Sequence, residues 1–284
     1  MGYYHICSDG NHAFALFLSE KDFKAAMNAV AVCAFITRIE ILAFVLMDNH
    51  FHFAVRAADE NQCRRFIFEL KRMIGIRLAK DPERSGVMRR LPIRIITVGS
   101  EDYLKTLICY IIKNPTKARK GMFYTYPWGS GSLYFNQERK SRGTRVGDYG
   151  RRNLINIAGT HSRLPVDWLI ADGIILPENY VCIGEVEQLF KSTRSFMFFL
   201  SKSVDEDIEK DYQEWNDIGL DDTEMRRERD IIAKKLFGTA RLRDLTGPDR
   251  IILAKQLRRR FFCTPKQLSR VVQVPLKDIE QRIM

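Results

Sequence analysis

A single residue separates two histidines, His50 and His52, in the segment FVLMDNHFHFAVR (residues 44–56). Residues 38–47 and 51–56 are apolar, β-prone runs on either side of Asp48 and Asn49, which tolerate turn conformations, so they predict a β-hairpin. Because side chains alternate along a strand, His50 and His52 should leave the same face of the sheet. Two neutral imidazoles on one face can bind a divalent metal ion, although an isolated His-x-His is more often incidental.

A tyrosine about sixty residues later could do chemistry beside such a metal. Ser100 is a typical N-cap for a helix over residues 101–114, whose apolar stripe should face the sheet: Leu104, Leu107, Ile108 and Ile111. Tyr103 and Tyr110 share a different stripe, and Asn114 lies one turn beyond Tyr110. A phenol can attack phosphorus while a metal polarises the phosphoryl oxygen. The alternative is that Tyr110 is an ordinary amphipathic residue with its hydroxyl at the surface.

The elements that must position these residues predict an α+β fold. Residues 3–8 read as a strand, Ser19 as the N-cap of a helix over 20–34, and residues 61–80 and 94–98 as a helix and a strand. Pro115 should end the helix that carries Tyr110, because the residue before a proline avoids the α region. The order β-α-β-β-α-β-α predicts a ferredoxin-like domain with an antiparallel sheet, followed by an all-α C-terminal region.

Charge is unevenly distributed and favours a polyanionic partner. The chain has 46 basic and 35 acidic side chains. Residues 1–135 carry 19 basic and 12 acidic ones, the expected linker 136–152 carries 6 and 2, residues 153–232 carry 8 and 17, and residues 233–284 carry 13 and 4. Two basic modules, 1–135 and 233–284, therefore flank an acidic one, and nucleic acid is the obvious partner. Many basic proteins bind no nucleic acid, so charge alone leaves that question open.

Composition excludes wholesale disorder and a membrane span. Apolar residues make up 45% of the 284, and the longest unbroken apolar run, residues 29–36, is far shorter than the roughly 18 residues a span needs. The six cysteines are scattered, which indicates reduced, mostly buried thiols of a cytoplasmic protein, neither a disulfide framework nor a zinc site.

Several motifs in order resemble one enzyme family. FVLMDNHFHFAVR (44–56), YLKTLICYIIKNPTKARKG (103–121) and YPWGSGSLYF (126–135) are similar to the single-tyrosine HUH transposases, above all the REP-associated tyrosine transposases, and YHICSDG (4–10) fits the opening strand of that family. The resemblance covers residues 1–135. It implies a ferredoxin-like nuclease that cuts single-stranded DNA, often near a hairpin, and keeps the 5′ end as a phosphotyrosine.

The resemblance assigns roles to particular residues. It makes His50 and His52 metal ligands, Tyr110 the nucleophile, and Asn114 a third polar ligand, with Mg²⁺ or Mn²⁺ as the cofactor. Asp48 stands where the family usually has proline, and it could alter the turn or add a carboxylate near the metal. We expect DNA contacts from basic residues on the helix 61–80 and around the tyrosine motif: Arg64, Arg65, Lys71, Arg72, Lys113, Lys117 and Arg119.

The C-terminal half carries no catalytic motif. Residues 164–200 predict short helices, residues 204–229 a charged helix, and residues 249–283 three helices, with Thr264 as an N-cap and Pro275 at the start of the last one. These short helices resemble a helix-turn-helix, with Lys277, Asp278, Gln281 and Arg282 on its recognition helix. The alternative is a small helical bundle that docks on the core or mediates dimers.

The expected organisation has four parts: a nuclease domain (1–135), a basic linker (136–152), an acidic helical region (153–232) and a basic DNA-binding module (233–284). The expected function is a DNA transposase or strand transferase acting on single-stranded or hairpin DNA, with duplex contacts from the C-terminal module, as a monomer or homodimer without membrane contact. The alternatives are an inactive, domesticated DNA-binding regulator and another HUH endonuclease, such as a relaxase or replication initiator.

Overall fold

The chain folds into two compact units, here described from a computed structural model of residues 1–8, 15–137, 142–201, 222–260, 263 and 265–283. Among these, residues up to 201 belong to the first unit and residues from 222 onward to the second. The fold is α+β, with an antiparallel sheet followed by helices, as the sequence predicts. Among the described helices none is long and apolar enough to cross a membrane.

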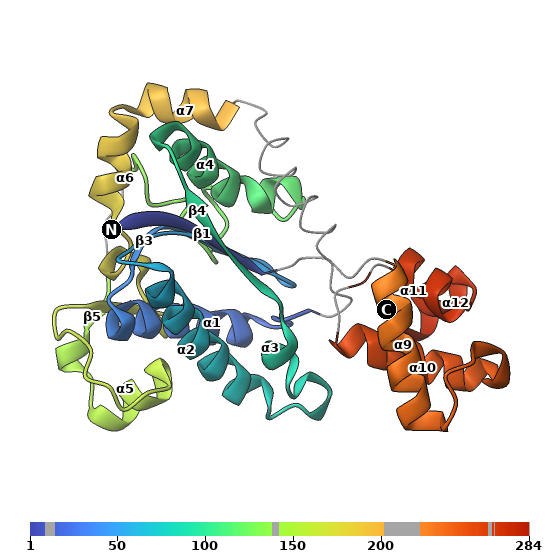
Figure 1. The fold of residues 1–284 in the computed structure, drawn as a ribbon. Helices are drawn as coiled ribbons and strands as arrows, with labels where there is room; N and C mark the ends of the chain where they lie inside the picture. The colour runs from blue at the N-terminus through green and yellow to red at the C-terminus, as the bar shows by residue number, and fades with distance from the viewer. Residues whose placement is uncertain (9–14, 138–141, 202–221, 261–262, 264, 284) are drawn as a thin grey trace. The chain divides into compact units, whose positions relative to one another are not determined.

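The first unit is built on a four-stranded antiparallel sheet in the order β2-β3-β1-β4. Its strands are β1 (Gly2–Ser8), β2 (Glu40–Leu46), β3 (Phe51–Ala57) and β4 (Ile93–Val98). Helices α1 (Glu20–Thr37) and α2 (Glu60–Leu78) cover one face, and α4 (Glu101–Lys117) covers the other, against β2 and β3 (Figure 1). The connections and strand order are those of the ferredoxin-like fold.

Short polar side chains start the three long helices. The Ser19 and Ser100 hydroxyls accept hydrogen bonds from the backbone N–H groups of Asp22 and Tyr103, so both predicted N-caps are confirmed. Asp59 caps α2 in the same way, through Gln62 N–H. Each bond satisfies a helix N–H that has no partner within the helix.

The expectation that Pro115 ends the tyrosine helix is wrong. Helix α4 continues through Pro115 to Lys117, and Ala118 N–H still bonds to the Asn114 carbonyl at 3.0 Å. A proline inside a helix lacks an N–H donor, and its ring crowds the carbonyl four residues earlier. Asn114 and Pro115 are both buried, so packing outweighs these costs and the local preference of the residue before proline. The predicted apolar stripe of α4 is buried throughout: Leu104, Leu107, Ile108 and Ile111.

The segment 126–135 covers the outer edge of β2. Leu46 N–H bonds to the Trp128 carbonyl at 2.8 Å, and the Ser130 hydroxyl accepts from Phe44 N–H at 3.0 Å. A Cβ atom at Gly129 would lie only 2.9 Å from the Phe44 carbonyl oxygen, so this close approach requires glycine. The edge of the sheet beside the histidine hairpin is thereby closed.

Residues 142–201 belong to the first unit and pack against its sheet and α1, whereas the sequence predicts a linker at 136–152 and a separate acidic region from 153. Thr144 and Arg145 form β5, which pairs with β6 (Leu169–Ala171), and β6 pairs with β7 (Ile174–Ile175). The buried Asn28 of α1 donates to the carbonyls of Ile157 and Gly173 and accepts from Ile175 N–H. Helices α5 (Arg151–Ala158), α6 (Ile183–Phe190) and α7 (Thr193–Ser201) complete this layer.

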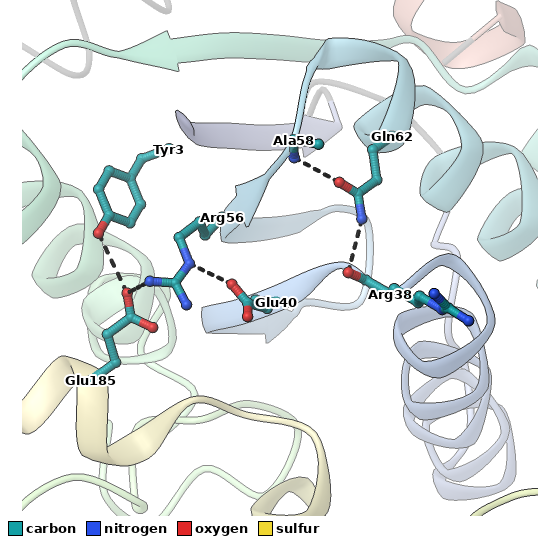
Figure 2. Close-up of polar contacts among 7 residues, drawn as sticks. All are labelled: Tyr3, Arg38, Glu40, Arg56, Ala58, Gln62 and Glu185. Atoms are coloured by element: carbon teal, nitrogen blue, oxygen red, sulfur yellow. Dashed lines mark hydrogen bonds and ion pairs between the residues drawn. The ribbon is translucent and has the colours of Figure 1, made fainter. Parts of the chain in front are cut away.

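An ion-pair cluster fastens α6 to the sheet (Figure 2). Arg56 of β3 donates to Glu40 of β2 and, at 2.6 Å, to Oε1 of Glu185 on α6, which also accepts from the Tyr3 hydroxyl at 3.4 Å. The two carboxylates raise the pKa of Arg56 above its usual value. Figure 2 also shows Gln62 bridging Ala58 N–H and the Arg38 carbonyl. Glu185, an acidic residue of this layer, therefore holds α6 against the sheet.

The second unit is a small helical bundle. Helices α9 (Asp222–Phe237), α10 (Gly247–Arg260), α11 (Pro265–Val272) and α12 (Leu276–Ile283) enclose a core that includes Met225, Leu253, Leu268 and Ile279. The three predicted C-terminal helices are confirmed, and Gln273 turns between the last two with a left-handed φ of 53°. The predicted N-cap Thr264 lies outside the described residues, as does most of the predicted helix 204–229.

Short helical pieces connect these elements. The first unit contains a 3₁₀ turn (Pro82–Arg84), α3 (Val87–Arg90) and two further 3₁₀ turns (Val146–Asp148 and Pro177–Asn179), and the second contains a 3₁₀ turn at Leu242–Asp244. Of these, α3 borders a cavity beside β4.

Candidate active site

Strand pairing brings three of the chain's histidines to one face of the sheet. Cys7 of β1 lies opposite His52 of β3, and His5 lies two residues before Cys7, so the three side chains share a face. His50 directly precedes β3, and its ring centroid lies 5.0 Å from that of His52. The opposite face is apolar, where Phe53 packs on Phe66 of α2 at 5.3 Å between ring centroids.

Helix α4 brings Tyr110 and Asn114 to these histidines. The centroid of the Tyr110 ring lies 5.5 Å from that of the His52 ring and 6.4 Å from that of the His5 ring. Asn114 Oδ1 lies 3.5 Å from His50 Nε2, and its amide nitrogen donates to the Tyr110 carbonyl at 3.0 Å. Four residues predicted to act together, His50, His52, Tyr110 and Asn114, therefore meet at one place.

The histidines share one face of the sheet, as the sequence predicts, and helix α4 covers that face. His52 is only 1% exposed and His5 is fully buried, whereas His50 and Tyr110 are half-buried. Burial, with the charges of His50, His5 and Lys117, holds the pKa of His52 well below its usual range. Burial and Arg94 lower the pKa of His5 to about 3. Both imidazoles are therefore neutral at pH 7, which is the form that binds metals.

His5 is a site residue that sequence reasoning missed. Its Nε2 lies 3.2 Å from His52 Nδ1, and the two rings are stacked at 5.4 Å between centroids. A hydrogen bond to one ring nitrogen fixes which nitrogen of a ligand histidine faces the metal. The sequence shows the pattern His-x-Cys in the first strand. Only the pairing of β1 with β3 brings His5 next to His52, and the hydrophobic periodicity of the sequence does not predict this pairing.

Two donor sets share His52. His50, His52 and Asn114 offer two nitrogens and one oxygen, a set that suits Mn²⁺ or Mg²⁺ with water and phosphate oxygens completing the shell. His5, Cys7 and His52 have ligand atoms within 4.8 Å of one another, and their two nitrogens and one sulfur suit zinc. The second set differs from the expectation that no cysteine joins a zinc site. Both sets include His52, whose neutral imidazole can bind a divalent metal.

Basic side chains accompany the tyrosine. Lys117 Nζ lies 4.7 Å from the centre of the Tyr110 ring, and Arg94 lies opposite Cys7 on the neighbouring strand β4. Lys113 is half-buried on α4, and Arg119 is exposed just after the helix, with a left-handed φ of 55°. This part of the site can therefore attract a phosphate.

Asp48 has its ion-pair and hydrogen-bond partners outside the histidine cluster. Its carboxylate pairs with Lys120 at 2.8 Å, and its backbone carbonyl accepts from Leu16 and Phe17 N–H. This pair ties the histidine hairpin to the segment that follows α4. Asp48 thus has a structural partner that the sequence did not indicate.

The predicted basic residues of α2 lie across the sheet from the histidines. Arg64, Arg65 and Arg72 are exposed, and Lys71 Nζ donates to the carbonyls of Arg89 and Leu91. Because α2 and α4 cover opposite faces, the structure does not bring these side chains to Tyr110. In the second unit, Lys277, Gln281 and Arg282 are exposed on α12, and Asp278 is half-buried.

Comparisons with known proteins add one weak structural similarity. No family model matches the chain, and no curated protein matches it. A solved structure of a REP-associated tyrosine transposase bound to a REP hairpin aligns with a TM-score of 0.39 and 14% identity, over 60% of this chain and 93% of that one. These values do not define a family. The candidate site is therefore defined by its own residues, a tyrosine and an amide from α4 facing imidazoles from β1 and the β2–β3 hairpin.

Proposed function

We propose that the chain is a metal-dependent enzyme that cleaves and rejoins single-stranded DNA, with Tyr110 as the nucleophile, as in a DNA transposase. The observation that carries the proposal is the convergence of a tyrosine with metal-binding side chains: the Tyr110 and His52 rings lie 5.5 Å apart, and Asn114 Oδ1 lies 3.5 Å from His50. The sequence resemblance at residues 44–56 and 103–135 supports the same reaction.

His50, His52 and Asn114 would hold the divalent metal. When bound, Mg²⁺ or Mn²⁺ would polarise a phosphoryl oxygen and offset charge on the leaving oxygen. Burial keeps His52 in its neutral form, and His5 orients its ring through Nδ1. Asn114 also bonds to the Tyr110 carbonyl, so one side chain links the ligand set to the turn of α4 that carries the nucleophile.

The proposed reaction is a pair of transesterifications. The Tyr110 hydroxyl loses its proton and attacks phosphorus, forming a tyrosyl O–P bond as the P–O3′ bond breaks and the 3′-oxygen takes a proton. In the second step a 3′-hydroxyl attacks the phosphotyrosine and releases the tyrosine. Each bond broken is replaced by a similar one, so the reaction needs no nucleotide triphosphate.

Lys117 and Arg94 have charges suited to the DNA phosphates. Lys117 lies over the Tyr110 ring, and Arg94 is close enough to His5 to lower its pKa. Cations beside the nucleophile attract the phosphate it attacks and stabilise the charge that develops there. The exposed basic side chains of α12 would add contacts to a duplex stem.

A cleavage assay tests the proposal. A hairpin oligonucleotide with a single-stranded flank, labelled at each end in separate samples, is incubated with the protein and Mn²⁺ or Mg²⁺. We expect a free fragment ending in a 3′-hydroxyl, and the 3′-side fragment attached to protein on a denaturing gel. EDTA should abolish both. Binding without cleavage in either metal would contradict the enzyme and favour a DNA-binding regulator.

A further inference from the structure

A cavity of about 670 Å³ lies beside the edge strand β4, bounded by α2 and α3. Its apolar lining includes Ile67 of α2, Met88 of α3, and Ile93 and Ile95 of β4. This volume falls in the range of small-ligand pockets, so it can take a nucleotide but not a folded partner. The proposed reaction does not use it.

An exposed aromatic ring borders this cavity. Phe68 is 66% exposed and lines the cavity, although its neighbours Phe66 and Ile67 are buried in the core. An aromatic side chain in this position offers its face to a flat ligand, and stacking on it favours any nucleobase without sequence preference.

Arginines surround the apolar lining. Arg64, Arg72 and Arg89 line the cavity and are exposed. Arg64 pairs with Glu60, and Arg72 with Glu69, one turn away on the same helix. Such exposed pairs are worth only about 0.3–0.5 kcal/mol, so these guanidinium groups can exchange a carboxylate for a phosphate.

Lys71 holds the wall of the cavity in place. Its ammonium group donates to the Leu91 carbonyl at 2.7 Å, which ties α2 to the segment between α3 and β4. Burial lowers the pKa of this amine. Of the basic residues predicted to contact DNA from α2, Lys71 therefore has a structural use, whereas Arg64 and Arg72 face the cavity.

Strand β4 connects the cavity with the catalytic face. Ile95 lies opposite Ile6 and lines the cavity, whereas the preceding residue, Arg94, lies opposite Cys7 on the histidine face. Among the described strands only β1 pairs with β4, so no strand covers its outer edge. A nucleic-acid strand that crosses this edge would pass Arg94 between the two faces.

We propose that this cavity binds an unpaired nucleobase of a single-stranded DNA segment: the base stacks on Phe68, and Arg64, Arg72 and Arg89 contact the flanking phosphates. The inference rests on the proposed function for its choice of ligand, since cations around an apolar, aromatic-lined hollow match the charged backbone and flat bases of a single strand. It adds a binding site that is separate from Tyr110 and lies on the opposite face of the sheet.

Fluorescence anisotropy in EDTA tests binding without cleavage. A labelled 20-nucleotide single strand is titrated with the full-length chain, with Phe68→Ala, and with Ile76→Ala as the matched control, since Ile76 is 61% exposed on the same helix and does not line the cavity. Loss of one stacked base should weaken binding about 5- to 150-fold in Phe68→Ala. Ile76→Ala should stay within about twofold, and Phe68→Trp should restore most of the affinity.

Photocrosslinking locates the base. An oligonucleotide that carries 5-iododeoxyuridine at successive positions should crosslink to the α2 peptide containing Phe68. Equal affinity of Phe68→Ala and the parent chain, or crosslinks found only in other segments, would overturn the proposal. Neither measurement involves cleavage, so the two proposals can fail separately. If the chain cuts DNA but Phe68→Ala does not change its affinity, only the cavity proposal is wrong. If Phe68→Ala weakens binding but the chain does not cut DNA, only the proposed reaction is wrong.

Discussion

The imidazoles of His5 and His52 share a buried hydrogen bond, with 3.2 Å between Nε2 of His5 and Nδ1 of His52. If His52 binds a metal through Nε2, its proton must reside on Nδ1, so His52 is the donor and His5 the acceptor. In that arrangement, His5 holds His52 in the tautomer that can act as a ligand. This makes His5 a positioning residue of the proposed metal site.

Replacing His5 should weaken metal binding without touching a ligand of the His50–His52–Asn114 set. We expect His5→Phe to reduce Mn²⁺ affinity about 10- to 100-fold, and His5→Gln to retain more, because the amide oxygen still accepts a hydrogen bond. Calorimetry measures the affinity, and ¹⁵N chemical shifts of the His52 ring report its tautomer in metal-free protein. A His52 tautomer that is unchanged in His5→Phe would refute this role.

The two donor sets predict opposite responses to two substitutions. Asn114→Ala should weaken Mn²⁺ binding and leave Co²⁺ or Zn²⁺ at His5, Cys7 and His52 nearly unaffected, whereas Cys7→Ser should do the reverse. Thiolate-to-cobalt absorption shows directly whether Cys7 is a ligand. If both substitutions weaken binding of the same metal, the side chains of both sets form one binding site and the division into two donor sets is wrong.

Acid should destabilise the first unit through its buried histidines. The folded-state pKa of His5 is lowered to about 3 and that of His52 lies well below its usual value, whereas both are near 6.5 in the unfolded chain. The unfolded state therefore binds more protons below about pH 6.5. The free energy of unfolding should fall with decreasing pH in that range, by up to about 1.4 kcal/mol per pH unit per histidine.

Urea unfolding in EDTA between pH 7 and 4 measures this slope. His5→Gln should make the dependence shallower, and His161→Gln, at an exposed position, is the control. A slope in His5→Gln equal to that of the parent chain would show that His5 does not titrate as its burial requires.

The basic residues of α12 should set the salt dependence of duplex binding. The double substitution Lys277→Ala and Arg282→Ala removes two exposed cations, and each lost phosphate contact lowers the log–log slope of affinity against salt by about 0.9. Lys234→Ala with Lys235→Ala, two exposed cations on α9, is the matched control. If both pairs change the slope equally, α12 has no special role and binding is a property of net charge.

The N-terminal fold and most of its site could be predicted because local signals and the global fold agree there. The Ser19 and Ser100 caps, the alternation around His50 and His52, and the stripe of α4 each depend on residues close in sequence. His5 and Cys7 could not be found this way, because their role depends on β1 pairing with β3 across about 45 residues. Strand order is a property of the whole chain.

The packing of residues 142–201 depends on distant partners in the same way. Composition predicts a basic linker at 136–152 and an acidic helical region from 153, but Asn28 bonds to the backbone at Ile157 and Gly173, and Arg56 pairs with Glu185. Pro115 shows the same effect within one helix, where burial of α4 outweighs a local preference. Composition describes a segment alone, whereas packing depends on what the rest of the chain offers.

Mapping a covalent DNA adduct tests the central claim most directly. The protein is incubated with a single-stranded oligonucleotide and Mn²⁺, digested with protease and nuclease, and analysed by mass spectrometry. We predict a nucleotide joined through its 5′-phosphate to Tyr110, absent in Tyr110→Phe and retained in Tyr103→Phe, which changes the other tyrosine on the same stripe of α4. An adduct on Tyr103, or cleavage that persists in Tyr110→Phe, would contradict the account.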